Sequence, residues 1–270
     1  MNKYGKNFFI NDDNAKEYIE LIGDWMRGEV EAAGRSGLEI GMSGGIDCSV
    51  VARLAQEAGI PITLNMMPNG QSMDGEDMAN SMEFIEKFNF EKYRTINIQG
   101  TVKNAQNEVE QALGKPLDKL SLENIPPRVR MTMLYALAQA NRSFVIGTGN
   151  LNERLLGYFT KHGDGASDLN PLGMITKGEI YTLAKHLDMT KSIMEKPPSA
   201  GLSPGQTDEK DLGFPWSAVD KFIMNNTSGD EQIDKEIERR MTMSGHKLKV
   251  PPMFNGLKGI QNDATINYEK

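Results

Sequence analysis

The amino-acid sequence predicts an α/β fold, with a doubly wound, mostly parallel sheet flanked by helices. Short apolar runs alternate with helical segments of about 10–15 residues, a pattern typical of parallel strands whose connections cover both faces of a sheet. The first apolar run, residues 38–42, leads directly into a glycine-rich loop and then into a helix. Such a loop places backbone N–H groups where an anion can bind. We therefore expect a ligand site at the carboxyl end of the sheet.

Local signals support several of the predicted elements. Pro126 and Pro127 suit the first turn of a helix, and Thr176 with Glu179 has the spacing of a capping box. The predicted strands are residues 38–42, 61–67, 93–98 and 143–148. The predicted helices are residues 48–57, 74–88, 102–113, 126–141, 176–187, 216–225 and 232–243.

Residues 196–214 differ from these elements because they are rich in Pro, Gly and Ser and lack apolar periodicity. A loop of this length in a compact domain usually has a functional role. We predict that residues 199–214 form a lid that closes over bound substrates and excludes water.

The composition is that of an ordinary soluble chain of 270 residues, 39% hydrophobic and 25% charged. No linker-like shift divides it, so we predict one domain over residues 1–270. One cysteine cannot form an internal disulfide, and no apolar run approaches the ~18 residues of a membrane span. The net charge of −7 differs from the basic excess of nucleic-acid-binding proteins. We expect a cytoplasmic protein without a nucleic-acid or membrane partner.

The strongest motif is the loop Gly-Met-Ser-Gly-Gly-Ile-Asp-Cys at residues 41–48. It lacks the Lys of a Walker A motif and does not fit the G-x-G-x-x-G dinucleotide fingerprint. Residues 41–45 do fit G-x-S-x-G, the serine-hydrolase elbow, and His246 lies late enough to complete a triad with Ser43. That alternative lacks an H-G-G-G oxyanion motif. A purely structural tight turn is a second alternative.

Asp47 favours a nucleotide-binding interpretation of this loop. A carboxylate that points into a phosphate-binding loop repels its ligand unless a cation lies between them. Mg²⁺ commonly bridges carboxylates and nucleotide phosphates. The loop therefore predicts the binding of a magnesium–nucleotide complex.

The S-G-G-x-D pattern at residues 43–47 resembles the loop of the ATP pyrophosphatases, which cleave ATP between the α and β phosphates. Within that superfamily, residues 40–251 resemble the ammonia-dependent NAD synthetases. Eight further blocks follow in order: R-x-R-M at 128–131, G-T-x-N-x-x-E at 147–153, G-Y-x-T-K-x-G-D-G at 157–165, D-L-x-P-L at 168–172, T-K at 176–177, K-x-P-S-A at 196–200, Q-T-D-E at 206–209 and H-K at 246–247.

This resemblance implies an adenine nucleotide α-hydrolase-like fold and the ATP-dependent amidation of deamido-NAD by ammonia to form NAD. The substrate carboxylate would attack the α-phosphate of ATP and release pyrophosphate, and ammonia would then displace AMP from the acyl-adenylate. Mg²⁺ is the implied cofactor, with Asp47 and Glu153 as its ligands. The family forms dimers with sites at the interface, so we expect a homodimer.

The resemblance also implies roles for individual residues. Asp47, Asp164 and Lys177 would be catalytic, and Asp164 would position or deprotonate ammonium. The implied ATP-binding residues are Gly41, Met42, Ser43, Gly44, Gly45, Ile46, Asp47, Cys48, Thr148, Lys177 and Ser199. The implied deamido-NAD-binding residues are Arg128, Lys161, Asp168, His246 and Lys247. For His246 and Lys247, which follow the last predicted helix, interaction with the helix C-terminus is the alternative.

The chain departs from the family pattern at two residues. Cys48 stands where the family has Ser, which replaces a hydroxyl with a weaker thiol donor, and Ser199 stands where Thr is common. Glutamine-dependent relatives carry an additional amidase domain with its own Cys, so without a glutaminase domain we expect ammonia to be the direct nitrogen donor. Two alternatives stay open: another ATP-pyrophosphatase amidotransferase or a tRNA-modifying relative, and a nucleotide sensor without chemistry.

Overall fold

A four-stranded parallel sheet lies at the centre of the computed structural model, which describes residues 6–70, 75–198 and 207–252. The strand order is β3-β2-β1-β4. The strands are β1 (Leu38–Gly41), β2 (Ile62–Met66), β3 (Tyr93–Thr95) and β4 (Phe144–Val145). The chain leaves β1 toward β2 and later returns to the other side of β1 as β4. The strand order therefore reverses between β1 and β4, and open α/β sheets bind their ligands at the carboxyl end of such a point.

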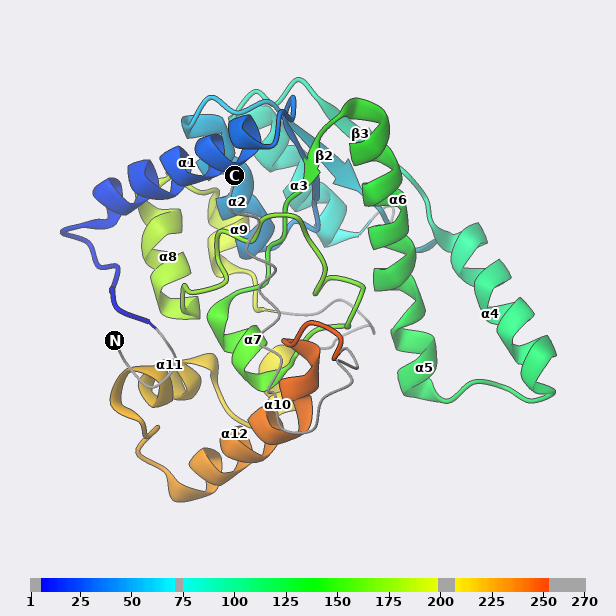
Figure 1. Ribbon diagram of the computed structural model, residues 1–270. Helices are drawn as coiled ribbons and strands as arrows, with labels where there is room; N and C mark the ends of the chain where they lie inside the picture. The colour runs from blue at the N-terminus through cyan, green and yellow to red at the C-terminus, as the bar shows by residue number, and fades with distance from the viewer. Residues whose placement is uncertain (1–5, 71–74, 199–206, 253–270) are drawn as a thin grey trace, which may run out of the picture.

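Helices cover both faces of the sheet, as predicted (Figure 1). One face packs in a common apolar core with α1 (Ala15–Ala32), α2 (Ile46–Glu57), α3 (Glu76–Lys87), α8 (Lys177–His186) and α9 (Lys191–Glu195). The other face packs against α6 (Ile125–Asn141), with α4 (Gln99–Leu113) and the short α5 (Lys119–Glu123) beside it. The sheet is therefore buried on both sides, which suits its parallel strands.

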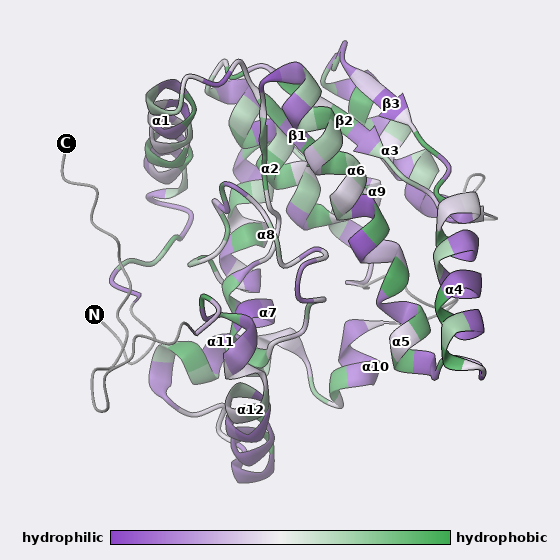
Figure 2. Ribbon diagram, turned by 45° about the vertical axis from the view of Figure 1, so that its right-hand side comes forward, coloured by the Kyte–Doolittle hydropathy of each residue, from purple (hydrophilic) through white to green (hydrophobic). Residues whose placement is uncertain are grey.

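The C-terminal part of the chain forms a second apolar cluster around Trp216, Phe222 and Ile237. Its elements are α7 (Leu151–Leu156), α10 (Asp208–Leu212), α11 (Trp216–Asn225), α12 (Glu231–Ser244) and the 3-10 turn η2 (Gly245–Lys247). Most of α12 is hydrophilic and faces away from this cluster (Figure 2). Through α7 and α8 the cluster borders the carboxyl end of the sheet, where the candidate site lies.

All seven predicted helices are confirmed, as α2, α3, α4, α6, α8, α11 and α12. The third and fourth strands were predicted too long, because only Tyr93–Thr95 and Phe144–Val145 are strand. The carboxylate of Asp168 accepts the backbone N–H of Val145 (2.8 Å), and Ile146 forms a single bridge to Leu169. A side chain and a loop thus replace a neighbouring strand at this edge.

Other differences concern helices that the sequence analysis did not assign. The amphipathic α1 is one, and it buries Met26 and Val30 against the core. Another is α10, which forms inside the segment 196–214 that was predicted to be irregular. Residues 199–206 of the predicted lid, including Ser199, lie outside the described residues.

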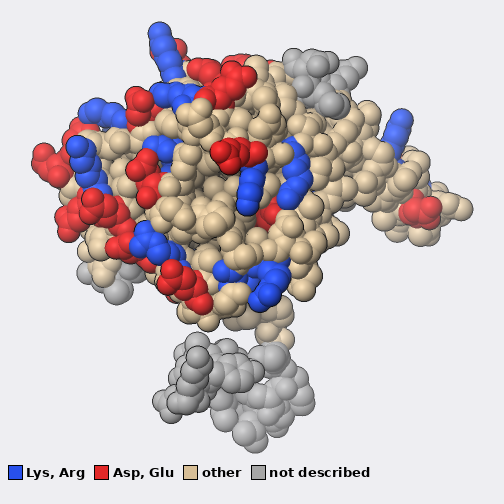
Figure 3. Space-filling view, turned by 90° about the horizontal axis from the view of Figure 1, so that it is seen from above, with Lys and Arg blue, Asp and Glu red and all other residues tan. Residues whose placement is uncertain are grey.

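The surface carries charges of both signs. On the face shown in Figure 3, acidic and basic side chains are interspersed over the body of the protein. In the described part of the chain, no helix combines the length and the apolar character that crossing a membrane requires.

Candidate active site

The glycine-rich loop connects the end of β1 to the start of α2. Gly44 has a φ of +69°, and a Cβ at this position would lie 2.3 Å from the carbonyl oxygen of Asp77, so the turn accepts only glycine. Gly45 is the N-cap of α2, and no side chain caps this helix in the described structure. The first N–H groups of α2 are therefore available to an anion, which the helix dipole also favours.

Cys48 stabilises this loop from the inside. Its side chain is buried. Its sulfur accepts the backbone N–H of Ser43 (3.4 Å), and its thiol donates to the carbonyl of Gly45 (3.2 Å). The hydroxyl of Ser43 lies 3.3 Å from the same sulfur. The thiol therefore supports the turn, while Ser43 itself is exposed to solvent.

Three charged side chains meet beside this loop. Lys177, the first residue of α8, forms an ion pair with Asp47 in the first turn of α2 (Nζ to Oδ2, 2.5 Å), and 95% of its side chain is buried. Asn150 donates to the other oxygen of Asp47 (3.1 Å). The backbone N–H of Asn150 donates to Glu153 (2.9 Å), in the capping box that starts α7. The loops after β1 and β4 and the N-terminus of α8 thus converge on one point, where they bring Asp47, Glu153 and Lys177 together.

The electrostatics of this group favour an additional cation. Burial and the neighbouring carboxylate of Asp47 raise the pKa of Glu153 to about 8, although Lys177 acts in the opposite direction. Burial disfavours the charge of Lys177, but Asp47 and Glu153 outweigh it and raise the pKa of Lys177. Two carboxylates therefore share one lysine. A divalent cation fits this pair, since Mg²⁺ is usually held by one or two carboxylates together with substrate phosphates.

Asp47 and Glu153 are the two described carboxylates at this point. No group of three or more His, Cys, Asp or Glu side chains suited to a metal occurs in residues 6–70, 75–198 and 207–252. This arrangement matches a cation shared with a ligand better than a permanently bound structural metal.

The position of Lys177 depends on residues far away in sequence. Asn152 accepts the backbone N–H of Lys177 (3.2 Å) and donates to Asp220 (2.7 Å). Asp220 also accepts the N–H of Gly178 (3.0 Å). Asn152 lies within the G-T-x-N-x-x-E block at residues 147–153 but was given no role there. Asp220 belongs to none of the motifs in the sequence. Sequence analysis therefore missed both.

The N-terminal segment also supports the start of α8. Lys6 is almost completely buried, and its Nζ contacts the carboxylate of Glu179 (2.9 Å) and the carbonyl of Met174 (2.8 Å). Glu179 closes the predicted capping box with Thr176 and also accepts the N–H of Ile10. The capping box is thus confirmed, and tertiary contacts hold it in place.

A second group of predicted residues gathers around Asp164. Lys161 donates to the carbonyl of His246 (3.2 Å), and Arg128 donates to the carbonyl of Lys161 (3.3 Å). Burial lowers the pKa of Lys247, and the nearby carboxylate of Asp164 opposes this shift by stabilising the charge of Lys247. The structure therefore brings together four of the five predicted deamido-NAD-binding residues and Asp164.

This group depends on close packing between α7 and α12. Gly157 ends α7 with a φ of +64°, and a Cβ there would lie 2.0 Å from the Cβ of Ser244. Lys247 donates to the carbonyls of Gly157 and Phe159 (2.7 Å each). Lys247 thus fastens the C-terminal turn to the segment that carries Lys161 and Asp164.

Asp164 has an unusual carboxylate. It accepts the backbone N–H of Thr160 (3.0 Å) and remains open to solvent. The protein around it nevertheless desolvates the carboxylate enough to raise its pKa, while the hydrogen bond from Thr160 lowers it. A carboxylate with a raised pKa is better matched to proton transfer near neutral pH than an ordinary one.

Asp168 and Thr148 have different surroundings. Asp168 binds the backbone of β4, and Tyr135 also hydrogen-bonds to it. No described hydrogen bond or ion pair joins Asp168 to Lys161, His246 or Lys247. Thr148 lies in the turn between β4 and α7, beside Asn150, and is partly exposed.

Arg130 lies near Asp164 and belongs to the sequence block at 128–131, in which it was given no role. Its Nε donates to the carbonyl of Met67 (2.9 Å), just beyond β2. Burial lowers its pKa, and the nearby carboxylates of Asp164 and Asp77 oppose that shift. Its neighbour Arg128 is exposed instead. Residues two positions apart in a helix point in different directions, and the structure shows that Arg130 is the arginine that faces inward.

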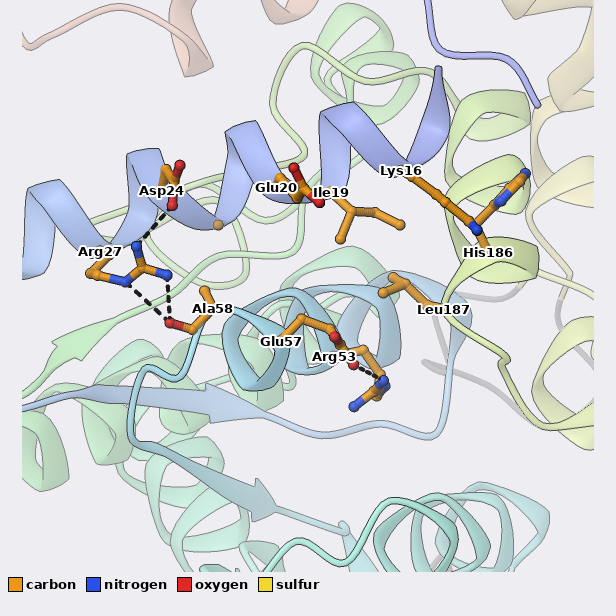
Figure 4. A pocket seen from close by; sticks show the side chains of 11 residues that line it. Lys16, Ile19, Glu20, Asp24, Arg27, Arg53, Glu57, Ala58, His186 and Leu187 are labelled. Atoms are coloured by element: carbon orange, nitrogen blue, oxygen red, sulfur yellow. Dashed lines mark hydrogen bonds and ion pairs between the residues drawn. The ribbon is translucent and has the colours of Figure 1, made fainter. Parts of the chain in front are cut away.

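Two pockets border different parts of the fold. One, of about 230 Å³, lies beside Lys177 and is lined by Tyr181, Glu209, Trp216 and Asp220, among others. A larger one, of about 520 Å³, lies between α1, α2 and the end of α8 (Figure 4). Because α2 has 12 residues, its two ends are roughly 18 Å apart, and the larger pocket borders the C-terminal half of this helix.

The serine-hydrolase alternative does not fit these contacts. The hydroxyl of Ser43 lies against the thiol of Cys48. His246 belongs to the turn η2, where its carbonyl accepts Lys161. No described contact joins Ser43 to His246, so the residues do not form a Ser–His pair.

Comparisons with known proteins agree with this arrangement. The family model NAD synthase matches residues 18–251. An NH(3)-dependent NAD(+) synthetase from Mycoplasmopsis pulmonis is 42% identical over 241 residues, which cover 87% of this chain and 89% of that protein. An NMN synthetase from Francisella tularensis has a similar structure, with a TM-score of 0.84, 34% identity, and coverage of 92% of this chain and 100% of that one.

A second solved structure has the same fold. An NH3-dependent NAD synthetase from Campylobacter jejuni, in complex with the nitrate ion, has a TM-score of 0.74 and 27% identity. The match covers 89% of this chain and 99% of that one. With a family model over residues 18–251 and a relative at 42% identity, this chain belongs to the NAD synthase family.

Proposed function

We propose that this protein is a ligase that catalyses the ATP-dependent amidation of deamido-NAD by ammonia to form NAD, AMP and pyrophosphate. The observation that carries this proposal is the convergence of Asp47, Glu153 and Lys177 beside the uncapped N-terminus of α2. Curated relatives over most of the chain are named NH(3)-dependent NAD(+) synthetases.

In the first step, a carboxylate oxygen of the substrate forms a bond to the α-phosphorus of ATP. The bond from that phosphorus to the oxygen bridging to the β-phosphorus breaks, and its electron pair leaves with pyrophosphate. The N–H groups of Gly45 and the first turn of α2 hold the phosphates, with Ser43 and Lys177 beside them. Asp47 and Glu153 would hold Mg²⁺, which supplies charge neutralisation for the polyphosphate when bound.

In the second step, the nitrogen of ammonia forms a bond to the acyl carbon and the carbon–oxygen bond to AMP breaks. The nitrogen then releases one proton to solvent water, and AMP leaves with the electron pair of the broken bond. Asp164 accepts the proton that ammonium must lose before its nitrogen can attack. Its raised pKa supports this role, because a stronger base removes a proton from ammonium more readily.

Binding of the dinucleotide is proposed at the group formed by Arg128, Lys161, His246 and Lys247. Four cationic or ionisable side chains at one place suit a ligand with two phosphates. Asp168 is included because it lies on the same chain segment as Lys161 and Asp164. Thr148 is included in the ATP site because it follows β4 at the carboxyl end of the sheet.

We also propose that the active form is a cytoplasmic homodimer. One cysteine in 270 residues suits a reducing compartment. Helix α4 buries none of its residues, and Val109, Leu113 and Leu120 are exposed along α4 and α5. Such an apolar strip supports a protein partner. Light scattering after gel filtration is expected to give twice the monomer mass.

A second candidate substrate is nicotinate mononucleotide, which has the same reacting carboxylate. The observation that favours it is the similarity to the Francisella NMN synthetase, whose TM-score of 0.84 exceeds the 0.74 of the Campylobacter NAD synthetase. The same chemistry would then act on half of the dinucleotide. Parallel measurements of kcat/KM for the two substrates distinguish these activities.

The experiment for the proposed function supplies ATP, Mg²⁺, ammonium and deamido-NAD. We expect one AMP and one pyrophosphate for each NAD formed. Lys177→Met is expected to lose turnover by at least about 100-fold, because a cation beside the transferring phosphorus is removed. Lys185→Met is the matched control, since Lys185 is an exposed lysine of the same helix. Absence of AMP with either nucleotide substrate would disprove the proposal.

A further inference from the structure

One ion pair outside the group just described lies beside the phosphate-binding loop. Lys196 follows α9, and its Nζ lies 2.7 Å from the carboxylate of Asp77 in the first turn of α3. The two residues are 119 positions apart in sequence. Nothing in the secondary structure requires this contact, because Lys196 lies in the irregular segment after α9.

Asp77 places the pair directly against the loop. Its carbonyl oxygen lies where a side chain on Gly44 would be, 2.3 Å from the ideal Cβ position. The same oxygen accepts the hydroxyl of Ser81 (2.8 Å), which fixes the first turn of α3. The carboxylate of Asp77 and the ammonium of Lys196 are therefore adjacent to the turn that receives the phosphates.

The two partners differ in their exposure to solvent. The side chain of Lys196 is 16% exposed, whereas that of Asp77 is 53% exposed. A largely buried ammonium needs an anion, and a half-exposed carboxylate contributes a weak one. Asp77 also attracts Arg130, the buried guanidinium near Asp164. The carboxylate of Asp77 thus interacts with two cations, although Asp164 attracts Arg130 more strongly than Asp77 does.

From this arrangement we infer that Lys196 is an additional phosphate-binding residue, which Asp77 holds beside the loop until a polyphosphate takes the place of that carboxylate. A phosphate oxygen carries more charge than the half-exposed carboxylate and offers several acceptor positions. The inference rests on the proposed function in that ATP is the nucleotide and pyrophosphate the product of the first step.

The inference predicts opposite effects for the two partners of the ion pair. Removing the ammonium with Lys196→Met removes a phosphate contact, so binding of pyrophosphate and ATP weakens. Removing the charge of the competing anion with Asp77→Asn releases Lys196, so binding is unchanged or tighter. If the pair has a structural role alone, both variants break the same contact and change binding in the same direction.

The experiment measures binding of magnesium pyrophosphate by calorimetry and KM for ATP in the full reaction. We expect Lys196→Met to weaken pyrophosphate binding about tenfold, the effect of losing one hydrogen bond to a charged group. We expect Lys196→Arg to retain most of the affinity, and Asp77→Asn to strengthen binding by up to about threefold, as for an exposed ion pair. Lys191→Met is the matched control, since Lys191 is an exposed lysine at the start of α9.

Thermal unfolding of each variant confirms that it is folded before its binding is compared. Wild-type affinity in Lys196→Met would overturn the inference, as would a matching loss of affinity in Asp77→Asn. These outcomes differ from failure of the proposed function. In that case the wild-type protein forms no AMP from ATP, whatever its affinity for pyrophosphate.

Discussion

The two ends of helix α2 differ in whether side chains hydrogen-bond to their backbone groups. At its N-terminus, no described side chain caps the helix, and Asp47 forms a buried ion pair with Lys177. At its C-terminus, Arg27 donates two hydrogen bonds to the carbonyl of Ala58 (3.2 and 2.8 Å). The larger pocket, of about 520 Å³, lies at this second end (Figure 4).

The comparison shows that the size of a pocket does not identify the active site here. Around the larger pocket, Arg27 pairs with Asp24 and Arg53 pairs with Glu57, and both of these ion pairs lie at the surface. At the N-terminal end, the first helix N–H groups have no partner among the described side chains, and two carboxylates share one buried lysine. Unbalanced charge and open N–H groups indicate a charged ligand, because both are costly to bury without one.

The largest expected effect is at Asp47. Asp47→Asn removes one of the two proposed cation ligands and the partner of Lys177, so turnover is expected to fall by roughly 10²–10³-fold. NAD formation and thermal unfolding are measured together. Glu57→Gln, at the other end of the same helix, is the matched control and is expected to keep normal turnover. Near-normal activity of Asp47→Asn would remove this residue from the mechanism.

The pH dependence of stability tests the charge imbalance itself. The pKa of Glu153 is raised from 4.5 to about 8, so between these values the folded protein binds a proton that the unfolded chain has lost. Stability is therefore expected to fall as pH rises through this window, and Mg²⁺ should stabilise the protein more at about pH 8.5 than at about pH 6.5. Melting temperatures measured at both pH values, with and without Mg²⁺, check this.

Glu153→Gln is the control for that experiment. It keeps the shape of the side chain without a titrating group, so its stability should vary less with pH and respond less to Mg²⁺. An equal response to Mg²⁺ in this variant would show that the cation binds elsewhere.

A smaller effect is expected at the other end of α2. Arg27→Met removes the two hydrogen bonds to Ala58, and we expect a loss of about 1–2 kcal/mol in the free energy of unfolding. Steady-state kinetics should not change, since this end lies roughly 18 Å from the loop. Denaturant unfolding and kcat/KM are measured on the same preparation. A large change in KM for ATP would show that the two ends are coupled.

The smallest effect is expected at Cys48. Cys48→Ser retains a group that can accept the N–H of Ser43 and donate to Gly45, so KM for ATP should be similar or slightly lower. The KM for ATP of the two proteins is compared under identical conditions. A large rise in KM would mean that the thiol has a role beyond supporting the turn.

Local signals in the sequence were sufficient for much of the fold. The capping box of Thr176 and Glu179 and the prolines of α6 predicted their helices closely. The length of β4 was not predictable from its own residues, because Asp168, more than 20 positions later, takes the hydrogen bond that a strand neighbour would have taken. The helix α10 was missed because its segment is dominated by Pro, Gly and Ser.

The candidate site divides in the same way. The glycine-rich loop could be predicted from the sequence because its function depends on consecutive backbone groups. The sequence blocks shared with the family indicated Asp47, Glu153 and Lys177. The residues that position these three side chains could not be predicted from the sequence. Asn152 and Asp220 meet at the start of α8 from distant segments, and Lys6 reaches Glu179 across 173 positions of sequence.

The sequence by itself therefore determined the fold class, the loop and the family, because each depends on residues close together in the chain or on ordered motifs. The tertiary structure decided which charges share a partner, which end of α2 is open and which of Arg128 and Arg130 faces inward. Burial and distance control the energy of a charge, and both arise when segments far apart in sequence pack together.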